Sequence, residues 1–390
     1  YFLRQDMIAL LKKYRPNFFK QPRKVFEPCS GKGGFVVDIV AEFQHGLKEM
    51  YPDPVERTRV IMEECIYYAD INEVNIEIVT NVLLDPDNKY KKNYYLGDTL
   101  EIETLPEFDL VIGNPPYNAD GINNGATLWQ KFVRKGIDIW IKPEGLLCYV
   151  HPNGWRKPTT ERCSLNHGLF EKMTQDNTML ELHIHNAKDG KTTFNCGTRY
   201  DYYLMKKKDP NEWGTIIIDE ERVETHMKIT GSWLGNFNLK KIKNVTSGET
   251  KCKIVKGKYS RTSKKHSRKE KSEEFKYPLI YQTPTRAIRL IWSNIYDKHD
   301  TNLPKVIIGD SGGGSCQLDM KSQFGMTGDA FGIVVDNEEE GKAVLECVNS
   351  KEFADFMKSL QWSGFRWDMK VFKDFNKDST EVNSKLLFLQ

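Results

Sequence analysis

Apolar positions in the first two hundred residues follow two spacings in turn, one typical of amphipathic helices and one typical of buried strands. The helical spacing occurs in residues 6–14, 35–43, 72–84 and 128–141. Short apolar runs separate these helices, in residues 24–26, 65–69, 94–96, 108–112 and 145–150. Alternating strands and helices predict a mostly parallel sheet covered by helices on both faces. In sheets of this kind, ligands bind beyond the carboxyl ends of the strands.

The alternation fades after about residue 225, where basic, glycine-containing and aromatic segments follow. A helical stretch is then predicted for residues 338–360. Because 390 residues exceed the usual length of one domain, we expect two domains. The first, residues 1–225, is predicted as the α/β domain, and the second, residues 226–390, as a mixed α+β domain.

The charge is unevenly distributed. The net charge is +3, yet residues 240–271 hold 13 Lys and Arg against two Glu, while the remaining residues hold 44 Lys and Arg against 52 Asp and Glu. A basic segment in an otherwise acidic chain indicates a polyanionic partner. The alternative is a solvated loop, and both can hold, because basic loops often become ordered only on nucleic acid.

No apolar run reaches the roughly 18 residues needed to cross a membrane, and no secretion signal is recognisable. The chain begins with Tyr1 and not with Met, which is typical of a sequence that continues upstream. The eight cysteines include no Cys-x-x-Cys pair, a usage typical of reduced, cytoplasmic proteins. A zinc site could be imagined from a group whose spacing matches no standard pattern, so no metal is expected: Cys163, His167, His183, His185 and Cys196.

A glycine-rich turn, FEPCSGKGGF, follows the first predicted strand and precedes a helix. Glycines there permit a tight turn and let a ligand approach the backbone. The string matches neither a Walker A loop nor the dinucleotide Gly-x-Gly-x-x-Gly pattern. Asp70 ends the second strand, where a carboxylate can accept hydrogen bonds from ribose hydroxyls. Asp98 ends the third strand. The alternatives are a helix cap for Asp70 and a turn residue for Asp98.

Asn114-Pro115-Pro116-Tyr117 follows the fourth strand. The two prolines fix an extended backbone and remove two N–H donors. The Asn114 side-chain oxygen and the Pro115 carbonyl then form a rigid pair of acceptors for the two hydrogens of a planar amino group. Accepting both hydrogens polarises the nitrogen toward an incoming methyl group, and Tyr117 offers a ring face for stacking. A plain proline turn is the alternative.

This order of motifs resembles the amino-methyltransferases of DNA, and more narrowly the gamma class of adenine-N6 enzymes from restriction–modification systems. The resemblance implies a Rossmann-like domain that uses S-adenosylmethionine, followed by a target-recognition domain for double-stranded DNA. The implied cofactor-binding residues are Glu27, Cys29, Gly31 and Gly33 for the methionine part, Asp70 for the ribose, Ile71 for packing on the adenine and Asp98 for the adenine amino group. The implied residues for the target base are Asn114, Pro115, Pro116 and Tyr117, with Phe194 as a second stacking ring. A core position is the alternative for Phe194.

The resemblance also implies a cytoplasmic location in a bacterial, phage or DNA-virus setting, and a separate restriction endonuclease is a candidate partner. No cluster of nuclease carboxylates occurs, so we expect no cleavage by this chain. The expected DNA contacts are Lys264, Lys265, Arg268 and Lys269 on phosphates, and Arg286, Arg289 and Arg366 on bases. The family's N-terminal Thr-Pro motif is missing, since Tyr1-Phe2-Leu3-Arg4 stands near its place.

Three alternatives stay open. The same acceptor pair suits the N4 amino group of cytosine. Release-factor methyltransferases also use Asn-Pro-Pro-Tyr, on a protein glutamine, but their extra domain precedes the catalytic one. A catalytically inactive DNA-binding module would keep the fold without needing an intact glycine turn.

Overall fold

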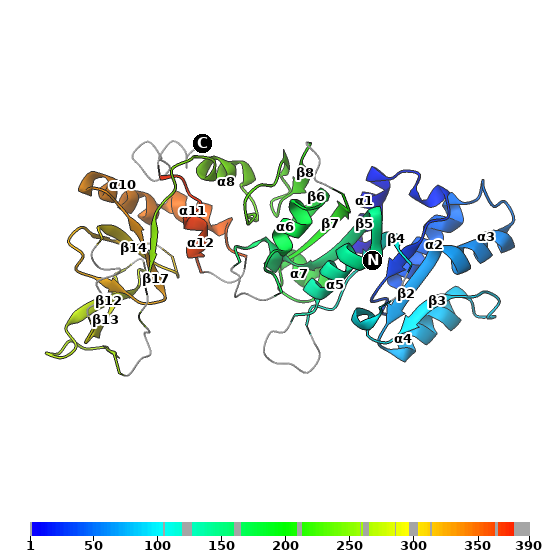
Figure 1. Ribbon diagram of the computed structural model, residues 1–390, viewed down its shortest axis with the longest axis horizontal. Coiled ribbons are helices and arrows are strands. Elements are labelled where there is room, and N and C mark those ends of the chain that lie inside the picture. Colours follow the sequence, from blue (N-terminus) through cyan, green and yellow to red (C-terminus); the bar gives the residue numbers. More distant parts are fainter. Residues whose placement is uncertain are drawn as a thin grey trace. The chain divides into compact units, whose positions relative to one another are not determined.

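The chain forms two compact units, Tyr1–Trp233 and Leu234–Gln390 (Figure 1). The first unit extends past residue 225 because β9 (Glu224–Met227) belongs to its sheet. The computed structural model describes residues 2–103, 106–118, 127–159, 165–208, 213–257, 259, 265–284, 286–295, 303–312, 314–362 and 366–377. Among these residues, no helix is both long and apolar enough to span a membrane.

The described part of the first unit builds a nine-stranded sheet in the order β3-β2-β1-β4-β5-β7-β6-β8-β9. The other strands are β1 (Val25–Glu27), β2 (Ile66–Asp70), β3 (Asn93–Leu96), β4 (Phe108–Gly113), β5 (Ile141–Pro152), β6 (Thr178–His185), β7 (Tyr200–Lys206) and β8 (Thr215–Ile218). The first five strands run parallel, and β7 is antiparallel to both β5 and β6. The predicted fold class is therefore confirmed.

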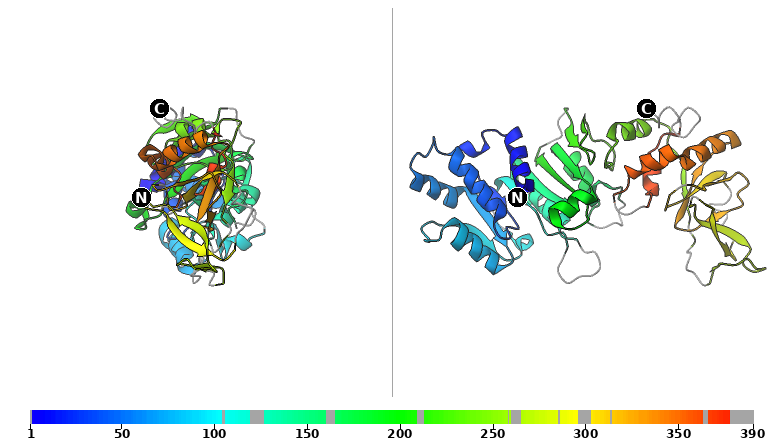
Figure 2. Two further views of the ribbon diagram at one scale, coloured as in Figure 1. Left: turned by 90° about the vertical axis from the view of Figure 1, so that its left-hand side faces the viewer. Right: turned by 180° about the vertical axis from the view of Figure 1, so that it is seen from behind.

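Helices cover both faces of this sheet (Figure 2). They are α1 (Phe2–Tyr14), α2 (Gly34–Gly46), α3 (Pro54–Val60), α4 (Glu73–Glu77), α5 (Trp129–Lys135), α6 (Leu169–Thr174) and α7 (Ala187–Phe194). Shorter 3-10 or π-helical segments are η1 (Phe18–Lys20), η2 (Ile61–Cys65), η3 (Ile78–Leu84), η4 (Thr99–Glu101), η5 (Gly136–Trp140) and η6 (Asn153–Arg156). The helices predicted for residues 72–84 and 128–141 are present, but each changes from α-helical to π-helical halfway.

The two faces of the sheet are packed differently. On one face, α1, α2 and η3 bury aliphatic and aromatic side chains in one large cluster. On the other face, Phe26 stacks on Phe108 with ring centroids 4.7 Å apart and meets Trp140 edge to face at 5.4 Å. Burial of both faces explains why the central strands have no alternating polar positions.

The described part of the second unit contains two four-stranded sheets, ordered β10-β17-β14-β15 and β11-β13-β12-β16. Their strands are β10 (Ile254–Lys256), β11 (Ser267–Arg268), β12 (Tyr277–Gln282), β13 (Arg289–Ser293), β14 (Lys305–Gly309), β15 (Gln317–Asp319), β16 (Gly325–Met326) and β17 (Ala330–Val334). Its helices are α8 (Leu239–Thr246), α10 (Glu338–Asn349), α11 (Lys351–Lys358) and α12 (Met369–Phe372).

The helical stretch predicted for residues 338–360 is present, but Ser350 divides it into α10 and α11. Ser350 adopts an extended conformation, and its hydroxyl accepts a hydrogen bond from the Phe353 amide at 3.1 Å. A serine that caps the next helix in this way starts a new helix. The apolar spacing continues across the break and gave no sign of it.

Candidate cofactor and substrate site

The turns after β1 and β4 lie side by side, where the order of the sheet reverses direction. Strand β1 pairs with β4, and the next strands along the chain lie on opposite sides of this pair. A Cβ atom built at Gly113, the last residue of β4, would lie 3.6 Å from Cγ of Glu27, the last residue of β1. This is the position at which open α/β sheets bind their ligands.

Glycine is required in the turn after β1 for its conformation and for space. Gly31 and Gly33 have φ angles of +50° and +79°, in the left-handed region. A Cβ at Gly33 would lie 2.7 Å from Cγ2 of Val79, whereas a Cβ at Gly31 would meet nothing within 4 Å. The backbone at Gly31 therefore faces open space, and a ligand can approach it closely.

Asp70 connects the end of β2 to this turn. Its Oδ2 accepts a hydrogen bond from the Gly31 amide at 2.8 Å. Its Oδ1 accepts from the Asn72 amide at 2.8 Å and from Nδ2 of Asn75 at 3.1 Å. Asn72, and not Asp70, is the N-cap of α4. Asp70 is only 8 % exposed, while the next residue, Ile71, is 75 % exposed, so an apolar side chain stands in solvent beside the buried carboxylate.

Asp98 follows β3 and caps η4, because its Oδ1 accepts a hydrogen bond from the Leu100 amide at 2.9 Å. Asp98 is thus a turn residue in this structure. Its side chain is exposed, so the remaining lone pairs of its carboxylate oxygens are accessible to a ligand. The neighbouring Thr99 donates a hydrogen bond from Oγ1 to the Pro28 carbonyl at 2.8 Å. This bond ties the turn after β3 to the glycine-rich turn.

Two ionisable side chains, the buried Glu27 and the partly buried Cys29, lie at the start of the glycine-rich turn. Glu27 accepts a hydrogen bond from the Val36 amide at 3.2 Å, and burial raises the pKa of its carboxyl well above the usual range. Burial also raises the pKa of the Cys29 thiol well above the usual range, and the nearby carboxyl of Glu27 raises it further. A raised pKa disfavours the thiolate, which is the nucleophilic form of cysteine.

Asn114-Pro115-Pro116-Tyr117 leaves the sheet directly after β4. The side chain of Asn114 is exposed, Pro115 is buried and Tyr117 is partly buried. The Tyr117 ring meets Phe194 edge to face at 6.1 Å, and Phe194 meets Tyr200 edge to face at 5.0 Å. The Tyr117 hydroxyl is buried without a hydrogen-bond partner among the described residues, and burial raises the pKa of Tyr117.

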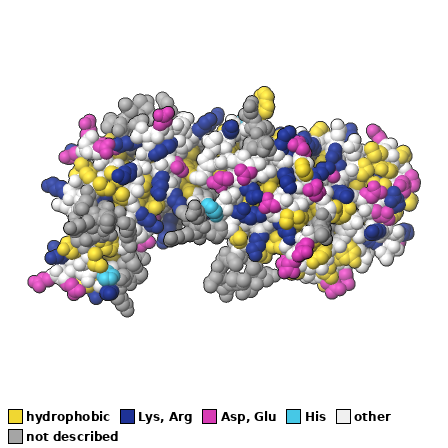
Figure 3. All heavy atoms as spheres, in the orientation of Figure 1, with side chains coloured by type: hydrophobic (Ala, Val, Ile, Leu, Met, Phe, Trp, Pro, Cys, Tyr) yellow, Lys and Arg dark blue, Asp and Glu magenta, His cyan; other side chains and the backbone are white. Residues whose placement is uncertain are grey.

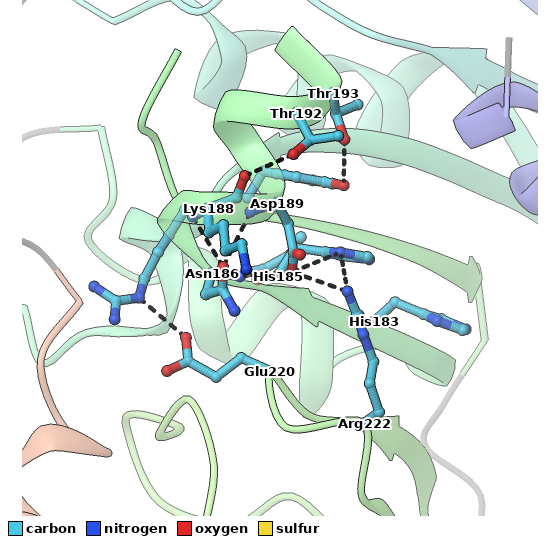
Figure 4. A network of polar contacts seen from close by, with 12 residues as sticks. His183, His185, Asn186, Lys188, Asp189, Thr192, Thr193, Glu220 and Arg222 are labelled. Atoms are coloured by element: carbon cyan, nitrogen blue, oxygen red, sulfur yellow. Dashed lines mark hydrogen bonds and ion pairs between the residues drawn. The ribbon is translucent and has the colours of Figure 1, made fainter. Parts of the chain in front are cut away.

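A network of polar contacts anchors α7, the helix that ends with Phe194 (Figure 4). Asn186 and Asp189 form a reciprocal capping box at the start of this helix. Arg222, from the turn between β8 and β9, donates from Nη2 to Asp189 at 2.9 Å and to Nδ1 of His185 at 3.2 Å. The ring of His185 stacks on Tyr200 at 4.4 Å, so the network also supports the aromatic group around Phe194.

This network was not predicted, although Asn186-x-x-Asp189 directly after a strand is a recognisable helix start. Burial, followed by the charge of Arg222, lowers the pKa of His185 to about 4. His183 likewise has partners, because its Nε2 lies 2.8 Å from Oε1 of Glu181. Cys163 of the imagined zinc group lies outside the described residues. Within them, no group of three or more His, Cys, Asp or Glu side chains could hold a metal ion.

The expected DNA contacts are distributed over the second unit, where Lys and Arg side chains stand among hydrophobic ones on the visible face (Figure 3). Lys264 lies outside the described residues, whereas Lys265, Arg268 and Lys269 are exposed at β11. The Arg268 guanidinium lies over the Phe275 ring, 4.4 Å from its centroid.

The three arginines expected at base edges lie elsewhere. Arg286 is exposed. Arg289, on β13, donates to Oε1 of Gln282 at 3.0 Å. Arg366 is paired with Asp310 at 3.1 Å. Lys265, Arg268 and Lys269 thus lie together in one short segment at β11, whereas Arg289 and Arg366 are engaged by protein partners.

The parallel strands, the antiparallel β7 between β5 and β6, and the glycine-rich turn after β1 are the features of a Rossmann-like methyltransferase fold. Residues 64–189 match the sequence profile of the family described as Eco57I restriction-modification methylase. Over this segment the first unit is therefore similar to methylases of restriction–modification systems. A comparison with curated protein sequences finds no match.

Solved structures of restriction–modification proteins are similar in fold. The type IIL restriction-modification enzyme MmeI, solved in complex with DNA, matches with a TM-score of 0.50 and 11% identity, covering 99% of this chain and 67% of that chain. A type I modification subunit from Vibrio vulnificus YJ016 matches with a TM-score of 0.40 and 15% identity, covering 57% of this chain and 49% of that chain. The M protein of the type I enzyme EcoKI matches with a TM-score of 0.39 and 17% identity, covering 66% of this chain and 57% of that chain. The chain thus spans about half the length of these type I proteins.

Proposed function

We propose that this protein transfers the methyl group of S-adenosylmethionine to the N6 amino group of an adenine flipped out of a specific DNA sequence. The observation that carries the proposal is the position of Asn114-Pro115-Pro116-Tyr117. The motif follows β4 directly beside the glycine-rich turn after β1. An amino group held by this motif would lie next to a cofactor held by that turn.

The glycine-rich turn and the ends of β2 and β3 supply groups that fit each part of the cofactor. The open backbone at Gly31 suits the methionine part. A carboxylate can accept about four hydrogen bonds, so Asp70 keeps room for a ribose hydroxyl beside its three present donors. The exposed Ile71 would pack on the adenine ring, and Asp98 would accept from the adenine amino group.

For this reaction the protein has to position the reacting groups more than it has to transfer protons. When bound, the cofactor supplies a sulfonium methyl group that is already electrophilic. The Asn114 side-chain oxygen and the Pro115 carbonyl would accept the two hydrogens of the target amino group and aim its nitrogen at the methyl group. Holding the reacting atoms in line at about 3–3.5 Å supplies much of the rate enhancement. Acceptors placed where positive charge develops on nitrogen add to it.

The target base must leave the duplex before it can reach this position, which costs a few kcal/mol. Stacking on Tyr117 and Phe194 would offset part of that cost. The second unit would act as the target-recognition domain, with the basic residues at β11 on phosphates and arginines such as Arg286 at base edges. A separate restriction endonuclease would complete the system, and the protein would act wherever its DNA is.

The product of the reaction tests the proposal. The protein is incubated with radiolabelled S-adenosylmethionine and unmethylated DNA, and the DNA is then digested to nucleosides and separated by chromatography. We expect the label in N6-methyldeoxyadenosine. Label in N4-methyldeoxycytidine would overturn the adenine assignment while leaving the amino-methyl chemistry intact. Label found only in protein, on glutamine, would overturn the DNA assignment.

A further inference from the structure

Arg4 of α1 lies against the first residue of α2, the helix that begins at the glycine-rich turn. A Cβ built at Gly34 would lie 3.0 Å from Cζ and Nη1 of Arg4 and 3.1 Å from its Nε. A side chain at residue 34 would therefore require the guanidinium to move by a few tenths of an ångström. Glycine at this position lets a cation lie directly over the start of the helix.

Asp38, one turn further along α2, holds this guanidinium in place. Nε of Arg4 donates to Oδ2 of Asp38 at 2.8 Å. The Asp38 side chain is 14% exposed, and that of Arg4 is 30% exposed. Because Nε is the inner nitrogen of the guanidinium, the pair sets the direction of the whole planar group and keeps part of it accessible.

We propose that Arg4 binds the α-carboxylate of the cofactor's methionine part. The inference rests on the proposed function and adds a residue to its cofactor site. The methionine part carries a carboxylate and an ammonium group on one carbon atom. Arg4 and the positive end of the α2 dipole favour the carboxylate. The Glu27 carboxyl, at the start of the same turn, has oxygen lone pairs that could accept a hydrogen bond from the ammonium group.

A second feature of the turn indicates a bound polar ligand. The Ser30 hydroxyl is buried and has no hydrogen-bond partner among the described residues. Buried hydroxyls without a protein partner are ordinarily satisfied by a ligand or by ordered water. The N-cap of α2 is Gly33, which has no side chain to cap the helix. The polar end of the cofactor would supply acceptors to this part of the turn.

The alternative is that Arg4 only joins α1 to α2. The chain offers a matched control, because Lys12 of α1 forms an ion pair with Glu42 of α2 at 2.9 Å. Lys12→Gln breaks an ion pair between the same two helices, two turns away from the glycine-rich turn. A role in joining the helices would make the two variants behave alike, whereas a role in cofactor binding would separate them.

The test compares two ligands by titration calorimetry on the full chain. S-Adenosylmethionine carries the α-carboxylate, and 5′-methylthioadenosine has the same nucleoside without the amino acid. For Arg4→Gln, we expect the dissociation constant for S-adenosylmethionine to rise at least about tenfold, the loss of one charge-assisted interaction. The affinity for 5′-methylthioadenosine should stay within about twofold. Lys12→Gln should change neither affinity, and Arg4→Lys, which keeps the charge, should restore part of the binding.

Each other outcome has a definite meaning. If Arg4→Gln binds S-adenosylmethionine like the wild type, the inference is overturned. If it weakens both ligands equally, or if Lys12→Gln has the same effect, Arg4 is a structural residue and the inference is likewise overturned. Thermal unfolding midpoints are measured for all variants to identify any that fail to fold. If Arg4→Gln does not fold, the comparison of Arg4→Lys with the wild type tests the inference. If the folded wild type binds neither ligand, the proposed function itself fails.

Discussion

The rings of Tyr117 and Phe194 meet edge to face, with centroids 6.1 Å apart and planes inclined by 77°. Tyr117 follows β4, whereas Phe194 ends α7, so distant parts of the sequence meet at the carboxyl edge of one sheet. This contact places an aromatic ring beside the motif that is proposed to hold the target base. It also makes the role of Phe194 testable against its alternative as a core residue.

Phe194→Leu should slow methyl transfer to DNA by about five- to a hundredfold, because stacking contributes about 1–3 kcal/mol per base. Phe194→Tyr keeps the ring and should retain most of the activity. Single-turnover rates and thermal unfolding midpoints are measured for both variants. A leucine variant with lower stability but an unchanged rate would return Phe194 to a core role.

Asp70→Ala should weaken S-adenosylmethionine binding by about 1.5–3 kcal/mol, the contribution of charge-assisted hydrogen bonds. The variant loses the acceptor for ribose and also the bond that holds the Gly31 amide. Asn75→Ala serves as the control, because it removes one donor to Asp70 and leaves the carboxylate. Calorimetry that finds the same affinity for Asp70→Ala and the wild type would exclude the ribose role.

Replacing the basic group at β11 with glutamine should weaken binding to all DNA sequences alike. The variant changes Lys264, Lys265, Arg268 and Lys269. Binding should also depend less on salt, by up to about 0.9 of log–log slope for each phosphate that the protein no longer neutralises, while site preference survives. A control variant changes four exposed lysines elsewhere in the second unit: Lys321, Lys342, Lys351 and Lys358. Equal salt slopes for the basic-group variant and the wild type would contradict the assignment.

His151 should make the fold sensitive to acid. Its ring is fully buried against Trp129 at 4.2 Å. Because a carbonyl only accepts, Nδ1 donates to Pro152, which leaves Nε2 to accept from the Tyr203 hydroxyl at 3.1 Å. Burial lowers the pKa of His151 from 6.5 to about 3. Between these two pKa values, His151 is protonated in the unfolded chain but neutral in the folded protein. Stability therefore falls as the pH drops from about 6.5 toward 3.

The His151 side chain should lower the free energy of unfolding by up to about 1.4 kcal/mol for each pH unit between about 6.5 and 3. His151→Gln removes the titrating ring and should give a flatter curve between pH 6.5 and 4, even if the variant is less stable at pH 7. Chemical denaturation at several pH values measures both slopes. Parallel curves for the two proteins would mean that His151 does not titrate in this way.

The sequence predicted the parts of the site that depend on local pattern. Apolar runs that end in Gly, Asp or Asn-Pro-Pro located the ends of β1, β2, β3 and β4, because parallel strands place such turns at one edge. The resemblance implied a stacking role for Phe194, but it did not predict the contact of this ring with Tyr117. This contact depends on β7 returning antiparallel between β5 and β6, which no local pattern encodes.

Contacts between distant segments account for most of what the sequence did not predict. Arg4 meets Gly34 across two helices, and Arg222 reaches α7 from the turn after β8. The spacing of apolar residues reports neither contact, since both depend on how helices settle on the finished sheet. Asp70 was expected near the ribose, but its hydrogen bond to the Gly31 amide follows from the same tertiary packing.

Asn114→Ala tests the central claim most directly, because Asn114 is proposed to hold the target amino group and not the cofactor. Methyl transfer to DNA is measured in a single turnover, and S-adenosylmethionine affinity is measured on the same protein preparation. Asn118→Ala, in the next exposed asparagine of this segment, is the control. We predict that Asn114→Ala slows transfer at least about a hundredfold, the cost of losing one group that stabilises developing charge, with cofactor affinity nearly unchanged. Transfer at a near-normal rate would contradict the account.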